Sequence, residues 1–314
     1  MAVDLVNPND PHIVKPPAHK STTLEKRAPL VATALSLILA IIKLTVGIMS
    51  GSVALLASAV DSIMDMFVSV FNFLAIRLSD RSPDEKFPFG YGKVEALAAT
   101  LEGLVVMGSG LFIFYESVQK FIHKESVTHV SLSIAVMLVS IVIVGALVAF
   151  LAYVVKKTGN MVIRADLLHY KTDLYSNGAV LLSLGIIYFT DWYWVDILFG
   201  LAIGLYIVRE AYELVEEGVR VLLDVSLPEE EVQKIIDIVE NDPDVTGFHF
   251  LKTRYAGKYK FVEMHLVLVP DIMLLHAHRI ADSIEEKIKR IDPESKWHVI
   301  IHLDPYDDSS MHDV

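Results

Sequence analysis

The sequence predicts an α-helical membrane protein with six transmembrane helices, followed by a C-terminal cytosolic domain of the α+β class. The 314 residues are 53% hydrophobic, and the mean hydropathy of +0.47 is high for a soluble protein. Apolar runs of about 20 residues, the length that spans a bilayer core, recur along the first two thirds of the chain. The last third shows short helix and strand patterns instead.

The expected membrane segments are separated by short polar connections. Their approximate ranges are 29–50, 53–78, 94–121, 129–155, 162–189 and 194–222. Basic residues gather before the first segment and in the second and fourth connections, whereas the other connections contain only Lys120 and Lys124. By the positive-inside rule, both termini are therefore expected to be cytoplasmic.

The character of the chain changes after residue 224, where a second domain is expected. Pro228 suits the first turn of a helix, and the glutamates that follow it suit the positive end of the helix dipole. We expect helices over 229–240 and about 273–291, a β-hairpin between them, and a last strand, WHVIIHL. This αββαβ order predicts a small two-layer domain. The expected parts are a flexible cytosolic tail at 1–27, a six-helix transmembrane domain at 28–224, the cytosolic domain at 225–307 and a flexible tail at 308–314.

Charge and composition restrict the function. Of the net charge of −12, the residues from Asp224 onward contribute −9, with 19 acidic against 10 basic side chains. This acidic surplus argues against nucleic acid as a partner. The chain has no cysteine, so any metal ligands must be histidine nitrogens and carboxylate oxygens.

Two aspartates lie inside the second apolar segment, in the stretch ASAVDSIMDMF. Asp61 and Asp65 are four residues apart, which places both carboxylates on one helix face. Burying a carboxylate in hydrocarbon costs at least about 2.5 kcal/mol, and intramembrane acids usually mark a functional site. The alternative, an exposed loop or helix cap, is disfavoured because apolar residues lie on both sides.

The fifth segment begins RADLLHYKTD and repeats this spacing with His169 and Asp173. Two facing pairs would supply one nitrogen and three carboxylates, a set that suits a tetrahedral divalent ion such as zinc. We favour a metal site over a structural polar cluster because the ion would neutralise the buried acids. Asp166, one turn earlier, is a candidate to receive the ion at the cytosolic mouth.

These ligand types also provide a way to couple metal to protons. Metal binds neutral imidazole and ionised carboxylate, so each binding event competes with protons. If the site opened alternately to the two sides, metal that leaves on one side could be replaced by protons, and antiport would follow.

The six segments, the D-x-x-x-D and H-x-x-x-D pairs, the LPEEE stretch and the αββαβ order together resemble the cation diffusion facilitator family. The likeness covers nearly all of 28–307 and is strongest to the bacterial zinc, cadmium and iron exporters. It implies a homodimeric, proton-coupled antiporter of the bacterial plasma membrane that exports zinc first, with cadmium or ferrous iron as alternatives. It also implies a ferredoxin-like or metallochaperone-like cytosolic domain, no enzymatic activity and no organic cofactor. The transport site maps onto Asp61, Asp65, His169 and Asp173.

The connection SPDEKFPFGYGKVEA departs from the family pattern. Relatives commonly carry histidines in this loop, whereas this chain has Phe87 and Tyr91, and aromatic carbons cannot ligate zinc. We therefore predict that the loop site is absent and that Asp84 is a solvated turn residue. The resemblance further implies a charge interlock in the dimer region between Lys93 and Asp224; the alternative is an ordinary positive-inside lysine.

Seven of the 12 histidines follow residue 224. Strand alternation places Val262, Met264 and Leu266 on the core face and leaves His265 outward. The alternative to a site is a set of surface histidines on an acidic domain. The resemblance implies a regulatory zinc site at the cytosolic dimer interface, formed by His249, His265, His278, His302 and Asp304.

Two other functions compete with this interpretation. A metal-responsive membrane scaffold or sensor would bind ions without net transport, but it would not need a complete intramembrane ligand set. A transporter of organic cations is disfavoured because no large aromatic cage surrounds the acids.

Overall fold

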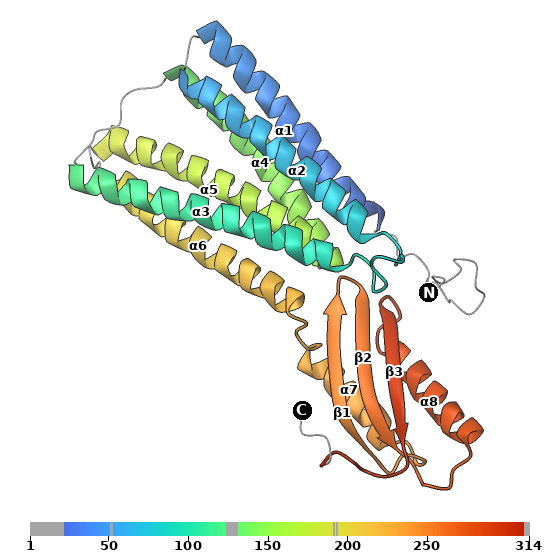
Figure 1. Ribbon diagram of the computed structural model, residues 1–314. Helices are drawn as coiled ribbons and strands as arrows, with labels where there is room; N and C mark the ends of the chain where they lie inside the picture. Colours follow the sequence, from blue (N-terminus) through green and yellow to red (C-terminus); the bar gives the residue numbers. More distant parts are fainter. Residues whose placement is uncertain (1–21, 51–52, 124–130, 191, 193, 311–314) are drawn as a thin grey trace, which may run out of the picture. The chain divides into compact units, whose positions relative to one another are not determined.

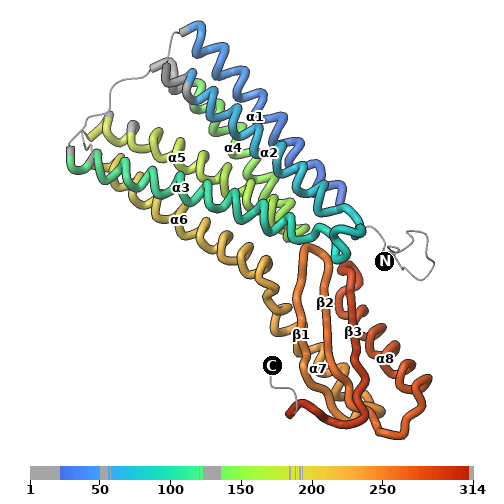
Figure 2. Tube along the Cα trace, in the orientation of Figure 1, coloured from blue at the N-terminus to red at the C-terminus, as the bar shows by residue number. Residues whose placement is uncertain are grey.

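The computed structural model describes residues 22–50, 53–123, 131–190, 192 and 194–310. Most of the predicted N-terminal tail and the last four residues of the predicted C-terminal tail lie outside these ranges. The chain divides after Gly218 into two compact units, whose backbone is traced in Figure 2. Each unit is described by itself.

The first unit is built of long helices that lie side by side (Figure 1). Their bounds are α1 Thr23–Ser50, α2 Val53–Ser79, α3 Lys93–His123, α4 Ser131–Thr158, α5 Met161–Thr190 and α6 Trp194–Leu222. Each contains most of one of the six apolar segments that the sequence predicts. The helical class of this part is therefore confirmed.

Four of the described helices contain a stretch that is long and apolar enough to cross a membrane. These stretches are Thr23–Met49, Ser58–Ser79, Lys93–Gln119 and Val136–Thr158. Helices α5 and α6 are of similar length, 30 and 29 residues. Ionisable side chains interrupt their apolar sequence, because α5 includes RADLLHYKTD and α6 includes REAYELVEE. The described residues thus show four candidate spans where six are predicted.

Helix α5 carries much of the candidate site, and its start is fixed by local chemistry. Gly159, with φ +62°, ends α4 in the left-handed conformation that favours glycine. Asn160 then caps α5, since its Oδ1 accepts hydrogen bonds from the backbone nitrogens of Val162 and Ile163 at 3.0 and 3.2 Å. The cap fixes where the helix begins, and hence which residues face its neighbours.

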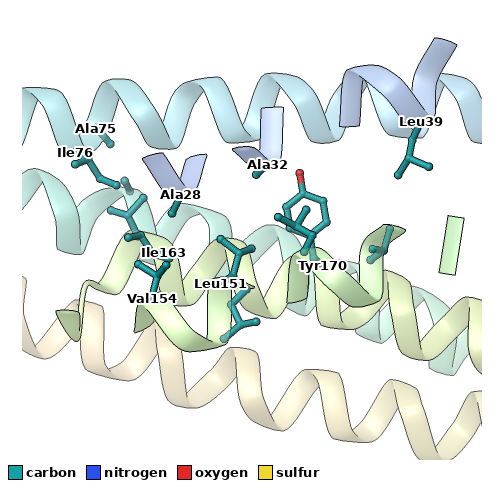
Figure 3. Packing of buried hydrophobic residues seen from close by; sticks show 14 residues of the cluster. Ala28, Ala32, Leu39, Ala75, Ile76, Leu151, Val154, Ile163 and Tyr170 are labelled. Carbon is teal, nitrogen blue, oxygen red and sulfur yellow. The ribbon is translucent and has the colours of Figure 1, made fainter. Parts of the chain in front are cut away.

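A continuous apolar core joins α1, α2, α4 and α5 (Figure 3). Ala28 and Ala32 of α1 are fully buried, and their small side chains allow close helix packing. Leu151 of α4 and Tyr170 of α5 lie in the same core. This packing holds α2 and α5 next to each other, which brings their acidic side chains together.

The second unit has the predicted αββαβ order. Its elements are α7 Glu229–Glu240, β1 Gly247–Ala256, β2 Tyr259–Val267, α8 Leu274–Lys289 and β3 Lys296–Asp304. The sheet order is β1-β2-β3, with β1 antiparallel and β3 parallel to β2. A ferredoxin-like domain would have a further strand before the first helix, and the described part of this unit has three strands.

Both helices of this unit cover one face of the sheet. The predicted core residues Val262, Met264 and Leu266 are at most 1% exposed and pack against α7 and α8. The register shifts between His249 and Lys252, a β-bulge where Phe250 has φ 52°. The other face carries His265, as the alternation predicts.

Candidate metal centres

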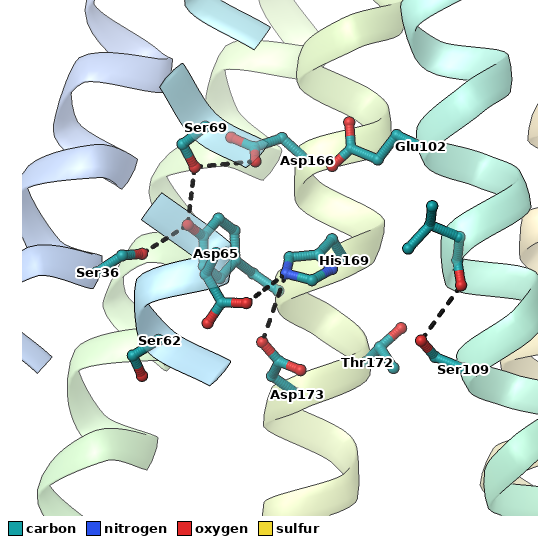
Figure 4. A network of polar contacts seen from close by, with 12 residues as sticks. Ser36, Ser62, Asp65, Ser69, Glu102, Ser109, Asp166, His169, Thr172 and Asp173 are labelled. Carbon is teal, nitrogen blue, oxygen red and sulfur yellow. Dashed lines mark hydrogen bonds and ion pairs between the residues drawn. The ribbon is translucent and has the colours of Figure 1, made fainter. Parts of the chain in front are cut away.

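Helices α2 and α5 bring three of the four predicted transport ligands together (Figure 4). His169 Nε2 lies 3.0 Å from Asp65 Oδ1 and 3.9 Å from Asp173 Oδ2. One ligand atom from each residue lies within 4.8 Å of the others. The side chains of Asp65 and His169 are 18% and 19% exposed. One imidazole nitrogen with two carboxylates is a donor set that suits zinc. We call these three residues the metal cage.

Asp61 is the predicted ligand that lies apart from this group. It sits one turn before Asp65 on α2, about 6 Å along the helix axis. Its side chain is exposed, and among the described residues it belongs to no group of closely spaced ligand atoms. The role of Asp61 as a fourth ligand therefore stays a proposal.

Lys43 of α1 is a neighbour of the cage that the sequence analysis missed. Its ammonium group donates to Ser62 Oγ at 2.8 Å and to the carbonyl oxygen of Ser58 at 3.4 Å. It interacts electrostatically with Asp65 and Asp173. The available signal was a single basic residue within an otherwise apolar first segment, because intramembrane ionisable residues usually have a function.

A second polar network lies next to the cage on α2, α3 and α5. Ser69 Oγ donates to Asp166 Oδ1 at 3.3 Å, and the Ser69 and Tyr170 hydroxyls lie 2.9 Å apart. Asn72 donates to Glu102 Oε2 at 3.0 Å. Asp166 is only 1% exposed, so its side chain is buried among the helices, and its role in receiving the ion stays a prediction. Glu102 was not foreseen, although it is an acid inside the third apolar segment.

The loop between α2 and α3 places Asp84 in the turn that the sequence predicts. Asp84 Oδ1 accepts hydrogen bonds from the backbone nitrogens of Lys86 and Phe87 at 3.0 and 2.9 Å. Its Oδ2 accepts one from the hydroxyl of Tyr91 at 2.6 Å. This bond from Tyr91 lowers the pKa of Asp84. Tyr91 thus places a hydrogen-bond donor next to the Asp84 carboxylate.

The sheet register builds a second candidate metal centre at one end of β1, β2 and β3. His249 pairs with His265 across β1 and β2, and His265 pairs with His302 across β2 and β3. Asp304 ends β3 among them. Its Oδ2 lies 2.8 Å from His265 Nδ1 and 3.4 Å from His249 Nε2, and its Oδ1 lies 3.2 Å from His302 Nε2. One carboxylate therefore contacts all three imidazoles.

The residues of this cytosolic centre fit a zinc ion. Both ring nitrogens of His249 are buried, and neither forms a hydrogen bond with a described residue. Carboxylate oxygens of Asp308 and Asp307 nevertheless lie 3.0 and 3.5 Å from them. A buried imidazole surrounded by carboxylates is the environment of a metal ligand. Asp308 falls in the predicted flexible tail and was missed by the sequence analysis, although the acid-rich stretch DPYDD was an available signal.

Comparison with known proteins covers both units. Residues 30–223 match the cation efflux transmembrane domain, and residues 227–306 match the cytoplasmic domain of cation efflux proteins. The chain belongs to the cation efflux family. This is the family that its motifs resemble, and its members are membrane transporters.

A relative that matches nearly the whole chain agrees with this assignment. The cation-efflux pump FieF of Escherichia coli O139:H28 is 40% identical over 282 residues, which cover 90% of this chain and 93% of FieF. Among solved structures, the metal-bound C-terminal domain of the CzcD transporter from Thermotoga maritima is 22% identical, with a TM-score of 0.23, and covers 24% of this chain and 87% of that one. CzrB in its zinc form is 32% identical, with a TM-score of 0.23, and covers 26% and 93%.

Two predicted features of this cation efflux protein lie outside the centres. His278 is on α8, 67% exposed, with Nε2 3.5 Å from Asp282 Oδ2. Among the described residues, it is not part of the closely spaced ligand group that contains His249. Asp224 accepts a hydrogen bond from Arg254 at 3.1 Å. Lys93 belongs to the other unit, and its interlock with Asp224 stays a proposal.

Proposed function

We propose that this cation efflux protein is a homodimeric, proton-coupled exporter of divalent metal, with zinc as its first substrate and cadmium or ferrous iron as alternatives. The observation that carries the proposal is the cage of Asp65, His169 and Asp173 within the helical unit. Three rigidly held donors, one of them nitrogen, favour zinc over a harder ion such as manganese. Asp61 would supply a fourth ligand after a small movement of α2.

Proton coupling follows from the chemistry of the cage. His169 lies within hydrogen-bonding distance of Asp65, so in the absence of metal a proton can be shared between them. Zinc requires the neutral imidazole and both ionised carboxylates, and its binding therefore displaces protons. Alternating access to the cage from the two sides would then exchange cytosolic metal for protons. We further propose that the protein acts in the bacterial plasma membrane, with six spans and both termini in the cytosol.

The cytosolic centre has a different proposed role. His249, His265, His302 and Asp304 would hold zinc from the cytosol, and the 225–307 domain would report metal load and stabilise the dimer. A second copy of the chain could bring its His278 to this centre and so complete the proposed interface site. Bound zinc would replace the repulsion between crowded carboxylates with attraction.

Transport is tested by zinc flux into proteoliposomes under an imposed pH gradient. We expect wild-type protein to carry zinc and Asp65→Ala to lose the flux. Glu116→Ala, a change of an exposed acid on α3, serves as the matched control and should retain it. Equal flux in wild type and Asp65→Ala would refute the cage as the transport site.

The same experiment separates the exporter from a metal-responsive scaffold or sensor. A sensor would bind zinc at its cytosolic centre and carry none across the bilayer. The sensor would be favoured if the wild type showed no flux but still bound zinc, and if His249→Ala abolished that binding.

A further inference from the structure

A pair of buried acids lies beside the metal cage. Asp166 of α5 is 1% exposed and Glu102 of α3 is 6% exposed. Figure 4 shows the side chain of Glu102 pointing from α3 toward Asp166. Asn72 of α2, fully buried, donates to Glu102 at 3.0 Å and also interacts with Asp166. Three helices therefore supply one compact, oxygen-rich group.

Each of these three side chains has a buried atom with no partner. Glu102 Oε1, Asp166 Oδ2 and Asn72 Oδ1 are inaccessible to solvent and accept no hydrogen bond from a described residue. Leaving a buried polar atom unsatisfied costs about 1–3 kcal/mol, and more when the group is charged. Within the described part of the chain, no lysine or arginine forms an ion pair with either acid. Two carboxylates placed together in this way need a cation to compensate them.

We propose that Glu102, Asp166 and Asn72 form a second cation site of the helical unit, distinct from the metal cage, that holds either a proton or the transported divalent ion. The donors are all oxygens, with the hydroxyl of Ser69 also bonded to Asp166 at 3.3 Å. Oxygen donors bind zinc more weakly than a site that includes imidazole. The second site is thus suited to transient occupancy. The proposal rests on the proposed function.

The second site is close enough to the cage to sense its occupant. Asp166 precedes His169 by three residues on α5, about 4.5 Å along the helix axis. The imidazole of His169 acts on both acids, and Asp65 and Tyr170 act on Asp166. A divalent ion in the cage would repel a cation from the second site through the low-dielectric interior. Metal binding at the cage would therefore expel a proton from Glu102 and Asp166, or lower the affinity of these acids for a second metal ion.

The test measures cation exchange when zinc binds to the full-length protein in detergent. Calorimetry in buffers of different ionisation enthalpy gives the protons released per zinc, and equilibrium dialysis gives the zinc ions bound per chain. The variant is Glu102→Gln, which keeps the shape and removes the charge. Glu116→Gln makes the same change at an exposed position of the same helix and is the matched control.

If the site holds a proton, Glu102→Gln should release about one proton fewer per zinc at an unchanged zinc count. If it holds metal, the variant should bind about one zinc fewer. Proton and zinc counts equal to the wild type would overturn the proposal. Asp166→Asn should reproduce the change, so the result does not depend on one variant folding. These measurements report binding and do not depend on transport. The second site can therefore be tested even if the protein fails to carry zinc in proteoliposomes.

Discussion

His169 Nε2 lies 3.0 Å from Asp65 Oδ1, so α5 and α2 meet through two candidate metal-ligand atoms and not only through apolar side chains. This contact compensates a half-buried carboxylate with a hydrogen bond. Under the proposed function, a metal ion would replace this bond in order to enter. The contact would then couple metal entry to the loss of a proton from the interface between α2 and α5.

Replacing His169 by aspartate should change the metal preference of the cage. The variant His169→Asp has only oxygen donors, so zinc affinity should fall about tenfold or more and manganese should gain relative to zinc. Competitive flux of the two ions in proteoliposomes measures this ratio. The exposed His276→Asp is the control. A zinc-to-manganese ratio equal to that of the wild type would contradict the assignment of His169.

Removing the charge of Lys43 should tighten zinc binding at the cage. The ammonium group interacts with Asp65 and Asp173 and so opposes a divalent ion at the same carboxylates. We expect Lys43→Met to raise zinc affinity about tenfold, a change that charge interactions at an effective dielectric constant near 20 readily supply. Zinc titration of the full chain measures the effect, with the exposed Lys156→Met as control. An unchanged affinity would show that Lys43 acts only through its hydrogen bonds to Ser58 and Ser62.

The sequence predicted the parts of the cage but not its full surroundings. Apolar runs placed the helices, and the i, i+4 spacing placed Asp65, His169 and Asp173 on helix faces. The spacing could not show which charged side chains of other helices point inward, because that depends on helix rotation and packing. Glu102 and Lys43 were missed for this reason, and Asp61 was grouped with ligands from which the structure separates it.

The cytosolic centre shows the same limit in a sheet. Alternation predicted that His265 faces outward, but strand register decides that it meets His249 and His302. Register depends on pairing between distant segments and on the bulge at Phe250. The position of Asp308 could not be predicted, because the irregular segment after the last strand has no repeating hydrophobic pattern that would indicate its path.

Asp304 should be essential for zinc binding at the cytosolic centre, since its carboxylate contacts three histidines. In Asp304→Asn we expect zinc to lose its stabilising effect on this unit. At zinc concentrations about 100 times the dissociation constant, that effect amounts to about 2.7 kcal/mol. Amide hydrogen exchange of β3, with and without zinc, measures it in the full chain.

The control for this experiment is Asp271→Asn, an exposed acid of the same unit. The control should keep the zinc-dependent protection of β3. If Asp304→Asn also kept the zinc-dependent protection of β3, Asp304 would not be a zinc ligand of the centre.

The α2–α3 loop should gain a metal site when histidines replace its aromatic residues. The rings of Phe87 and Tyr91 lie 4.7 Å apart, and Tyr91 contacts Asp84. The double variant Phe87→His/Tyr91→His would supply two imidazoles and one carboxylate, enough for zinc with a water ligand. Elemental analysis should show about one more zinc per chain. Phe87→Leu/Tyr91→Leu is the control, and an unchanged zinc content in the histidine variant would refute the prediction.

The most direct test of the central claim is anomalous diffraction at the zinc edge from crystals of the full chain grown with zinc. We predict a zinc peak between α2 and α5, bound by Asp65, His169 and Asp173 at about 2.0–2.2 Å. Zinc at His249 and Asp304 with no zinc between α2 and α5 would contradict the claim that this cage carries the exported ion.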